Sequence, residues 1–471
     1  MTKPATLFDK IWDSHLVTRL HDGRELVFVD RHVLQETTSA QAFDGLRRNR
    51  RKIAYPELNF ATQDHILSTE PGRTENTFAP GRELLSLMRK NAEEHGVRLF
   101  AAGSARQGIV HVISPELGIA YPGCLLACGD SHTSTVGGVG ALGIGVGTSE
   151  VEHILATQTL ALRKPKTMRI WFENQLGFGV TAKDLILYTI GQHGIGMGTG
   201  HAVEYAGPTI RAMSIEARLT VCNLSIELGA RLGVAGPDEK TFAYLENRAF
   251  APNQADWAEA VTHWSSLATE EDAVFDAEYS IDSSRVAPQV TWGTTQEDVV
   301  AVDQPLPMPS QFASASRREQ AGEALTYMDL EAGRPIEGLP IDVAFIGSCT
   351  NGRLSDLESA AAVLRTIGGR VPDNLRALVV PGSVAVKRAA EELGLDKVFL
   401  AAGFEWREPG CSMCLSINGD VVKPGQRCLS TSNRNFVGRQ GPGSRTHLTS
   451  PAMVAAGALA GSIVDVRKAA R

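Results

Sequence analysis

The sequence predicts an α/β fold of three α/β/α domains, each built on a mostly parallel sheet. Short apolar runs such as LVFVD at 26–30 alternate with helical patterns such as ELLSLMRKNAEEHG at 83–96. Alternation of strand and helix is typical of a parallel sheet covered by helices. The chain has 471 residues, and a typical domain size of roughly 150 residues gives about three domains. Its 46 glycines indicate many tight turns between elements.

The first domain is expected at residues 1–166. Strands are predicted in GVRLFAAG (96–103) and CLLACGD (124–130), and a helix is predicted in SEVEHILATQTLAL (149–162). The segment KPKTMRIWFEN begins with a Lys-Pro break, after which a new strand is predicted. The second domain is therefore expected at residues 167–300.

The second domain carries two predicted helices. The first, TAKDLILYTIGQHG, begins with Thr181 and Asp184 at capping-box spacing, with Asp in place of the preferred Glu. The second is TVCNLSIELGARLG at 220–233. The stretch DQPLPMPSQFASASRREQ is rich in Pro, Ser and Gln and predicts a linker at about 302–325, at the start of a third domain that spans 301–471.

The third domain repeats the alternation of strands and helices. A strand is predicted in IDVAFIGSC (341–349), a helix in DLESAAAVLRTIGG (356–369), a strand in RALVVPG (376–382) and a helix in SVAVKRAAEELG (383–394). The apolar stretch MVAAGALAGSIVDV (453–466) is shorter than the ~20 residues that cross a bilayer, so it predicts a buried helix.

Charge and cysteine content exclude several classes of protein. The formal net charge of -7 provides no global positive field for nucleic acid or anionic lipid. The N-terminal stretch has no apolar run before Asp9, so neither a secretory signal nor a membrane anchor is expected. Seven cysteines, an odd number spread over a long chain, argue against a disulfide framework and for a reducing compartment. We therefore expect a cytoplasmic protein.

Cys411 and Cys414 form a C-x-x-C pair behind a Pro-Gly turn. A zinc ribbon would need a second such pair, which the sequence lacks. A thioredoxin-like dithiol would need the pair at a helix N-terminus near the front of a domain, whereas this pair comes late in a large one. Cys349 lies where the apolar strand of AFIGSCTNGR ends, the place at which open α/β sheets bind ligands. The three thiolates could therefore converge.

Three cysteines without a credible fourth suggest a particular cofactor. A cubane iron-sulfur cluster held by three cysteines leaves one iron open to a substrate, which makes the cluster a Lewis acid instead of an electron carrier. The other cysteines lie in apolar segments and are interpreted as small buried residues: Cys124, Cys128, Cys222 and Cys428.

Six motifs in this order resemble the aconitase superfamily, and within it the family of 3-isopropylmalate dehydratase large subunits. The motifs are TQDH, QGIVH, CGDSHTST, GSCTN, PGCSMC and STSNRNFVGRQG. The resemblance runs over essentially the whole chain. It implies one 4Fe-4S cluster held by Cys349, Cys411 and Cys414, whose fourth iron coordinates the substrate hydroxyl and carboxylate.

The resemblance also implies acid-base residues. Asp64 and His65 are adjacent, so they would need a loop or turn geometry to contact each other, and they are assigned to protonation of the leaving hydroxyl. His111, placed by its motif in an apolar strand, is paired with Asp130, which follows another strand. By residue type alone, Asp64 and His65 could equally be a core or surface pair, and His111 a satisfied core histidine.

A third pair is implied between His132 and Glu227. Asn223 and Glu227 are spaced i and i+4, one face of a predicted helix, and the resemblance aims Asn223 at the cluster and places Ser131 with it at the substrate. Without the resemblance, Asn223 and Glu227 would be interpreted as a solvated helix face.

Arg434 and Arg439 lie in TSNRNFVGRQG, and the resemblance places both in the active site. A guanidinium binds a carboxylate through two hydrogen bonds, which suits a small dicarboxylate substrate. A surface loop with two cations is the alternative. Two further motifs carry no function: GVGALG at 138–143 lacks the strand context of a dinucleotide site, and RRNRRK at 47–52 is expected to be a solvated loop.

The resemblance implies a hydro-lyase that isomerises 2-isopropylmalate and 3-isopropylmalate, a step of leucine biosynthesis, by dehydration and rehydration. Full-length aconitases carry a swivelling fourth domain, which we do not expect in this chain, so a separate small subunit is expected to supply the serine base. Gln35, where His is expected, and GQHGIGMGTGH at 191–201 keep a citraconate or methylmalate hydratase, or a related homoaconitase, open. An RNA-binding iron sensor and a dithiol oxidoreductase are more distant alternatives.

Overall fold

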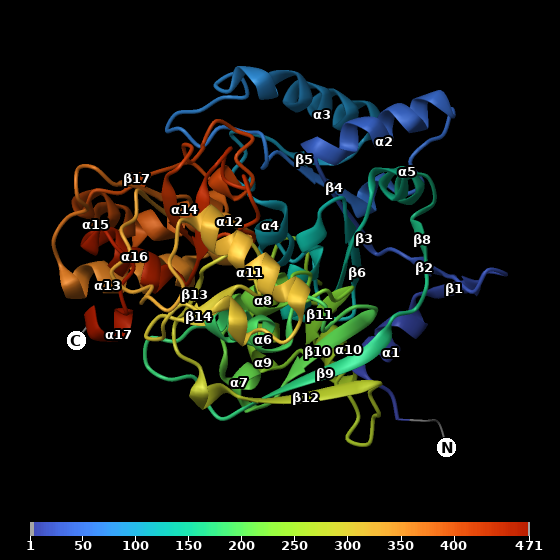
Figure 1. Cartoon of the computed structure of the whole chain (residues 1–471). Coiled ribbons are helices and arrows are strands. Elements are labelled where there is room, and N and C mark those ends of the chain that lie inside the picture. Colours follow the sequence, from blue (N-terminus) through green and yellow to red (C-terminus); the bar gives the residue numbers. More distant parts are fainter. Residues whose placement is uncertain (1–3, 470–471) are drawn as a thin grey trace. The chain divides into compact units, whose positions relative to one another are not determined.

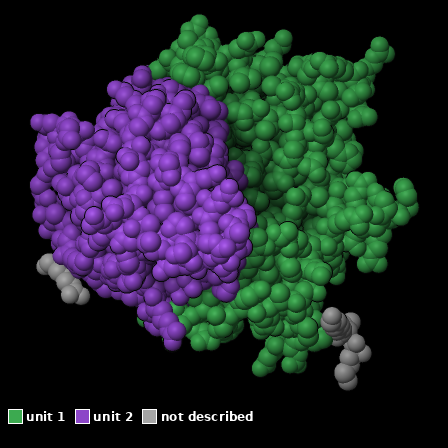
Figure 2. Space-filling model, in the orientation of Figure 1, with its two compact units in different colours: residues 1–67, 74–175, 196–282 green, residues 68–73, 176–195, 283–471 purple. Residues whose placement is uncertain are grey.

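The computed structural model describes residues 4–469 of the chain. The chain divides into two compact units, which Figure 2 distinguishes by colour. Unit 1 comprises residues 1–67, 74–175 and 196–282, and unit 2 comprises residues 68–73, 176–195 and 283–471. Among the described residues, none of the helices combines the length and apolar character needed to span a membrane.

The first sheet of unit 1 is five-stranded and parallel throughout, with the order β5-β4-β3-β6-β7. Its strands are β3 (Arg31–Gln35), β4 (Asn59–Thr62), β5 (Arg98–Phe100), β6 (Leu125–Cys128) and β7 (Leu142–Gly145). The helices around it are α2 (Glu36–Arg48), α3 (Arg82–His95), α4 (Val110–Glu116) and α5 (Thr148–Thr157). Helices α2 and α3 lie side by side (Figure 1).

Both faces of this sheet are buried, as the apolar runs require. Val33 and Leu34 are consecutive in β3 and therefore point to opposite faces. Leu34 packs with Phe43 of α2 and Met88 of α3, whereas Val33 belongs to a larger core that includes Val110 of α4. Strands buried on two faces show continuous apolar runs instead of alternation, which is why these segments could be recognised in the sequence.

Unit 1 contains two further sheets. A four-stranded parallel sheet has the order β11-β10-β9-β12, and a small antiparallel sheet has the order β1-β2-β8. The strands are β1 (Leu16–Arg19), β2 (Glu25–Phe28), β8 (Thr159–Leu162), β9 (Lys166–Glu173), β10 (His201–Ala206), β11 (Leu232–Ala235) and β12 (Ala277–Asp282). The helices are α1 (Leu7–Ser14), α7 (Pro208–Ala212), α8 (Ile215–Asn223), α9 (Glu239–Leu245) and α10 (Trp257–Ser266).

The glycines of GVGALG serve close packing. They begin in the 3-10 segment η3 (Ser131–Val139), which packs against α8 and β11. A Cβ atom on Gly138 would lie 2.5 Å from the backbone nitrogen of Leu219, and one on Gly143 would lie 2.0 Å from the carbonyl oxygen of Thr133. A side chain at either position would collide with backbone, so glycine is required for packing here.

Unit 2 is built on a second five-stranded parallel sheet, with the order β17-β16-β15-β18-β19. Its strands are β15 (Val343–Ile346), β16 (Arg376–Val379), β17 (Glu405–Trp406), β18 (Arg427–Ser430) and β19 (Arg445–Leu448), and a separate hairpin pairs β13 (Gln289–Thr291) with β14 (Val299–Ala301). The helices are α6 (Ala182–His193), α11 (Ala315–Met328), α12 (Ser348–Asn351), α13 (Leu354–Ile367), α14 (Val384–Glu392), α15 (Leu395–Ala402), α16 (Pro451–Ala460) and α17 (Val466–Ala469).

Most predicted elements are present, but two predicted helix ends and the predicted linker need correction. The helix predicted at 149–162 ends at Thr157, because Gln158 adopts a left-handed conformation and the apolar residues that follow form β8. The helix predicted at 220–233 ends at Asn223, and turns lead from there to β11. Much of the predicted linker is the helix α11, which Ser314 caps by accepting a hydrogen bond from the Arg317 amide.

The two five-stranded sheets share one topology. In chain order, each places its first strand at the centre, the next two on one side and the last two on the other. The order in which strands are added to the sheet therefore reverses between β3 and β6 in unit 1 and between β15 and β18 in unit 2. Ligands bind open α/β sheets at the carboxyl ends of the strands that flank such a point. Each unit thus has a defined place for functional residues.

Candidate functional site

In unit 1, Asp64 and His65 lie in the loop that follows β4, so the loop geometry that their contact requires is present. Asp64 Oδ1 lies 2.6 Å from His65 Nδ1. The loop is held by Glu36, the first residue of α2, whose carboxylate accepts hydrogen bonds from three consecutive amides, those of Asp64, His65 and Ile66, at 3.1, 2.7 and 2.6 Å. Glu36 was not predicted from the sequence, although its place directly after a strand was a signal.

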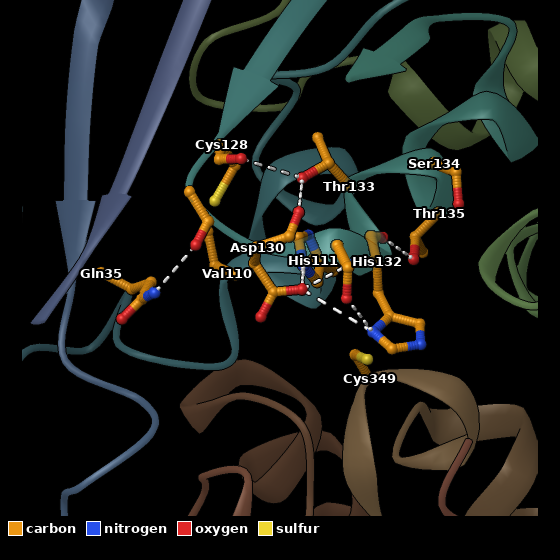
Figure 3. A network of polar contacts seen from close by, with 12 residues as sticks. Gln35, Val110, His111, Cys128, Asp130, His132, Thr133, Ser134, Thr135 and Cys349 are labelled. Atoms are coloured by element: carbon orange, nitrogen blue, oxygen red, sulfur yellow. Dashed lines mark hydrogen bonds and ion pairs between the residues drawn. The ribbon is translucent and has the colours of Figure 1, made fainter. Parts of the chain in front are cut away.

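Asp130 connects three groups at the carboxyl end of β6. Its carboxylate lies 3.1 Å from His65 Nε2 and 2.8 Å from His111 Nε2, and it accepts a hydrogen bond of 2.7 Å from the backbone amide of His132. Figure 3 shows the contacts of the Asp130 carboxylate with His111 and His132 as dashed lines. The pairing of Asp130 with His111 that the resemblance implies is therefore present in the structure.

The charges around Asp130 hold it and His65 as an ion pair. Burial alone would lower the pKa of His65, but the carboxylates of Asp64 and Asp130 outweigh burial and hold that pKa well above its usual value. Burial alone would raise the pKa of Asp130, but His111, His132 and His65 hold it well below its usual value. Both shifts favour the charged form of His65 beside the charged form of Asp130.

The prediction that His111 lies in a strand is wrong. Residues Val110–Glu116 form the helix α4, which begins directly after Ile109 in extended conformation. The apolar run was consistent with either a strand or a short buried helix, and periodicity cannot separate the two over seven residues. The backbone amide of Val110 donates to Asp64 Oδ2 at 2.9 Å, so the same carboxylate that orients His65 also anchors the helix that carries His111.

His132 pairs with Glu227, at 3.0 Å between Nε2 and Oε1, as the resemblance implies. The prediction that Glu227 continues the helix of Asn223 is wrong, because α8 ends at Asn223 and Glu227 lies in the turn that follows. Asn223 Nδ2 donates to Thr135 Oγ1 at 2.8 Å. Ser131 Oγ lies 3.4 Å from His132 Nδ1. All of these groups belong to unit 1.

In unit 2, Cys349 follows β15 and lies in the short helix α12. The preceding residue, Ser348, has a φ of 74°, a left-handed conformation that serine rarely adopts. The Arg353 side chain, which is buried, donates to the carbonyl oxygens of Cys349 and Thr350 at 2.6 and 2.8 Å. Backbone strain of this kind persists only where surrounding contacts fix it and is common at functional sites.

Cys411 directly precedes the 3-10 turn η6 (Ser412–Cys414), and Cys414 is its last residue; the turn contacts α12. Ser412 also has a positive φ, 49°. Its hydroxyl donates to Asp420 at 2.8 Å, and Asp420 in turn accepts a hydrogen bond of 2.7 Å from Arg407 Nη2. A buried ion pair thus fixes the loop that carries both cysteines.

Asn433, in the segment after β18, connects the two cysteine elements. Its Nδ2 lies 3.4 Å from Cys349 Sγ, and its Oδ1 lies 3.5 Å from Cys414 Sγ. The sulfurs of Cys349, Cys411 and Cys414 are all buried within the same unit, and soft thiolates are the ligands that iron-sulfur clusters prefer. The residues present therefore fit an iron-sulfur cluster. Asn433 was not predicted as a site residue, although it lies within one of the recognised motifs.

The two predicted arginines lie in the loop that follows Asn433. Arg439 Nη2 is 4.0 Å from Cys414 Sγ, and its guanidinium lies over the ring of Phe436, 5.3 Å from the centroid. Arg434 is half-buried in the same loop. Both belong to the unit that carries the three cysteines.

The remaining cysteines differ from the trio. Cys124, Cys128, Cys222 and Cys428 are fully buried, and burial raises the pKa of each thiol. A thiol kept protonated in an apolar core is a poor metal ligand. All seven cysteines lie within the described residues, and none of them forms a disulfide there.

The chain is similar to known proteins over most of its length. The model of the aconitase family (aconitate hydratase) matches residues 9–461, and the chain belongs to this family. The chain is 54% identical over 466 residues to the 3-isopropylmalate dehydratase large subunit 1 of Bradyrhizobium diazoefficiens (strain JCM 10833 / BCRC 13528 / IAM 13628 / NBRC 14792 / USDA 110). The aligned region covers 99% of this chain and 97% of the relative.

Proposed function

We propose that the chain is the large, catalytic subunit of a hydro-lyase that interconverts 2-isopropylmalate and 3-isopropylmalate in leucine biosynthesis. The observation that carries this proposal is the 54% identity, over almost the full length of both chains, to a large subunit of 3-isopropylmalate dehydratase. The reaction removes water from one malate isomer and returns it at the neighbouring carbon, without net redox change.

His65 is the proton donor for the departing hydroxyl. Departure of hydroxide from carbon is slow unless an acid protonates the oxygen. Asp64 and Asp130 keep the imidazolium charged near neutral pH, and contacts to both ring nitrogens fix its orientation. In the rehydration step the same group, now neutral, accepts the proton of the incoming water.

The other two histidines are oriented by carboxylates. Asp130 faces His111 Nε2, and Glu227 faces His132 Nε2, so the opposite nitrogen of each ring is the one that can meet the substrate or its water. A carboxylate on one ring nitrogen fixes the tautomer and raises the basicity of the other. We assign both histidines to positioning and proton transfer.

Cys349, Cys411 and Cys414 hold one 4Fe-4S cluster. When bound, such a cluster supplies an open iron that acts as a Lewis acid toward the substrate hydroxyl and carboxylate. Ser131, Asn223, Arg434 and Arg439 are assigned to substrate binding. The two guanidiniums suit the carboxylates of a malate derivative, since each offers paired N–H donors.

A small subunit completes the enzyme and supplies the serine that removes the C–H proton. The name of the relative, a large subunit, supports the existence of such a partner. We place the enzyme in the cytoplasm. Three domains, at 1–166, 167–300 and 301–471, are proposed on the ground that the three large parallel sheets occupy residues 31–145, 166–282 and 343–448.

The test is anaerobic reconstitution of the chain with iron and sulfide, followed by addition of candidate small subunits. Turnover is compared on 2-isopropylmalate, citraconate, methylmalate and homocitrate. The proposal expects 2-isopropylmalate to have the highest kcat/KM and the large subunit alone to be inactive. A higher kcat/KM for citraconate than for 2-isopropylmalate would contradict it. The assay can resolve this difference, because a change from isopropyl to methyl in an apolar pocket is worth about 1–3 kcal/mol.

A further inference from the structure

Lys183 is a buried cation that the reaction described above does not use. It is the second residue of α6, and its side chain is fully buried. Its Nζ donates to the carbonyl oxygens of Thr431 and Ser432 at 2.5 and 2.7 Å. Burial lowers the pKa of Lys183 to about 7, partly opposed by Asp356 and Cys414. Buried ammonium groups are costly, so they are retained where an opposite charge compensates them.

The segment that Lys183 holds is the one that connects the cysteines. The hydroxyl of Thr431 accepts a hydrogen bond from the Gly347 amide and donates to the Gly347 carbonyl, both at 2.9 Å. Gly347 leads into the strained turn of Cys349. Two residues after Thr431, the side-chain amide of Asn433 contacts Cys349 Sγ and Cys414 Sγ. A shift of this segment would therefore displace contacts to two of the three sulfurs.

The nearby carboxylates are engaged elsewhere. Asp184 accepts hydrogen bonds of the helix cap from Thr181 and another from the Gln289 amide at 2.8 Å, and burial raises its pKa to about 6. Asp356 caps α13, where it accepts hydrogen bonds from the Arg353 amide and from Asn351. The thiolates of Cys414 and Cys349, together with these carboxylates, favour a positive charge at Lys183.

We propose that Lys183 is a positioning residue for the cysteine site: it clamps residues 431–433 against the Cys349 turn and supplies the positive charge that offsets the thiolates of a bound cluster. The inference rests on the proposed function, because it requires a cluster on the three cysteines. Removal of the charge should weaken cluster retention and disfavour addition of an electron to the cluster. Partners outside the ligand set typically change metal affinity by about 10- to 100-fold.

The test compares Lys183→Met, which keeps the length of the side chain, with Lys183→Arg, which keeps the charge. The control is Lys387→Met, which removes a partly buried lysine of unit 2 that pairs with Glu408 at 2.6 Å. Each full-length chain is reconstituted anaerobically. The rate of bleaching by an iron chelator and the reduction potential of the cluster are measured, and circular dichroism of the apo chain reports its folding.

In Lys183→Met the cluster is expected to bleach at least about tenfold faster than in the wild type and to have a more negative reduction potential. Lys387→Met is expected to match the wild type in both the bleaching rate and the potential. Unchanged bleaching and potential in a folded Lys183→Met chain would overturn the inference. If Lys183→Met does not fold, Lys183→Arg decides: the inference expects its potential to match wild type, and a shifted potential overturns it. A wild-type chain that holds the cluster but does not turn over 2-isopropylmalate after a small subunit has been added would refute the proposed function alone.

Discussion

Replacement of Asp130 by Asn removes the charge that connects three groups of unit 1 while it keeps the shape of the side chain. The wild-type carboxylate accepts a hydrogen bond from the His132 amide at 2.7 Å and lies 2.8 and 3.1 Å from His111 and His65. Loss of one partner of a largely buried charge pair costs about 3–5 kcal/mol. We therefore expect Asp130→Asn to lower the free energy of unfolding of unit 1 by about this amount at pH 6.

The loss of unfolding free energy in Asp130→Asn, here called the deficit, should depend on pH in a defined direction. The raised pKa of His65 contributes stability that is fully present below the usual value of 6.5 and is lost as the pH rises through the raised pKa. The lowered pKa of Asp130 contributes stability that is present above the usual value of 3.8 and is lost as the pH falls through the lowered pKa. The deficit is therefore greatest between these two usual values and shrinks in alkaline solution.

The assay is hydrogen exchange, measured by mass spectrometry on peptides from β6 and α4, with the exposed Asp272→Asn as the control. Histidine NMR follows the His65 resonance, whose pKa should fall in Asp130→Asn. The control should change stability by less than about 0.5 kcal/mol. A deficit of the same size at about pH 6 and pH 10, or an unchanged pKa of His65, would refute the assignment of Asp130 as the charge that holds His65.

Three further outcomes are expected. Cys349→Ser should abolish the brown colour of the reconstituted chain and its activity with an added small subunit. Cys222→Ser, which alters a buried core thiol, should retain both; visible absorbance and turnover with the small subunit check this. Asp420→Asn should loosen the loop of Cys411 and lower the free energy of unfolding of unit 2 by about 3–5 kcal/mol, as measured by hydrogen exchange. An effect below about 1 kcal/mol would contradict the role of the ion pair between Asp420 and Arg407. Gly138→Ala should lower the free energy of unfolding of unit 1 by about 2–4 kcal/mol, because its Cβ would lie 2.5 Å from a backbone nitrogen. If the variant has the same free energy of unfolding as the wild type, η3 can shift to make room for the methyl group.

The α/β class and most strands and helices could be predicted from local pattern. The strands of the five-stranded sheets are buried on both faces, so they are short continuous apolar runs between turn residues. Glu227 shows the limit of this reasoning, because i, i+4 spacing places two residues on one face only if the helix continues, and α8 ends at Asn223. His111 shows another limit, since an apolar run of this length fits a strand and a short buried helix equally well.

The residues of the candidate site could be predicted through motifs, whereas most of their supports could not. Glu36 binds three amides 28 to 30 residues away in the chain, and Asp420 accepts a hydrogen bond from Thr69, 351 residues away. Such contacts depend on how the strands are ordered in each sheet, which no local pattern records. In the sequence, Lys183 is an ordinary residue of the first turn of a helix, and its contacts with residues 431–432 are present only in the folded chain.

Mössbauer spectroscopy of the anaerobically reconstituted chain, with and without 2-isopropylmalate, tests the central claim most directly. Three cysteine ligands leave one iron of a 4Fe-4S cluster without a protein thiolate. We predict that one iron in four gives a distinct signal and that this signal alone shifts when the substrate is added. Four irons that stay equivalent with and without substrate, or a chain that binds no iron, would contradict the account.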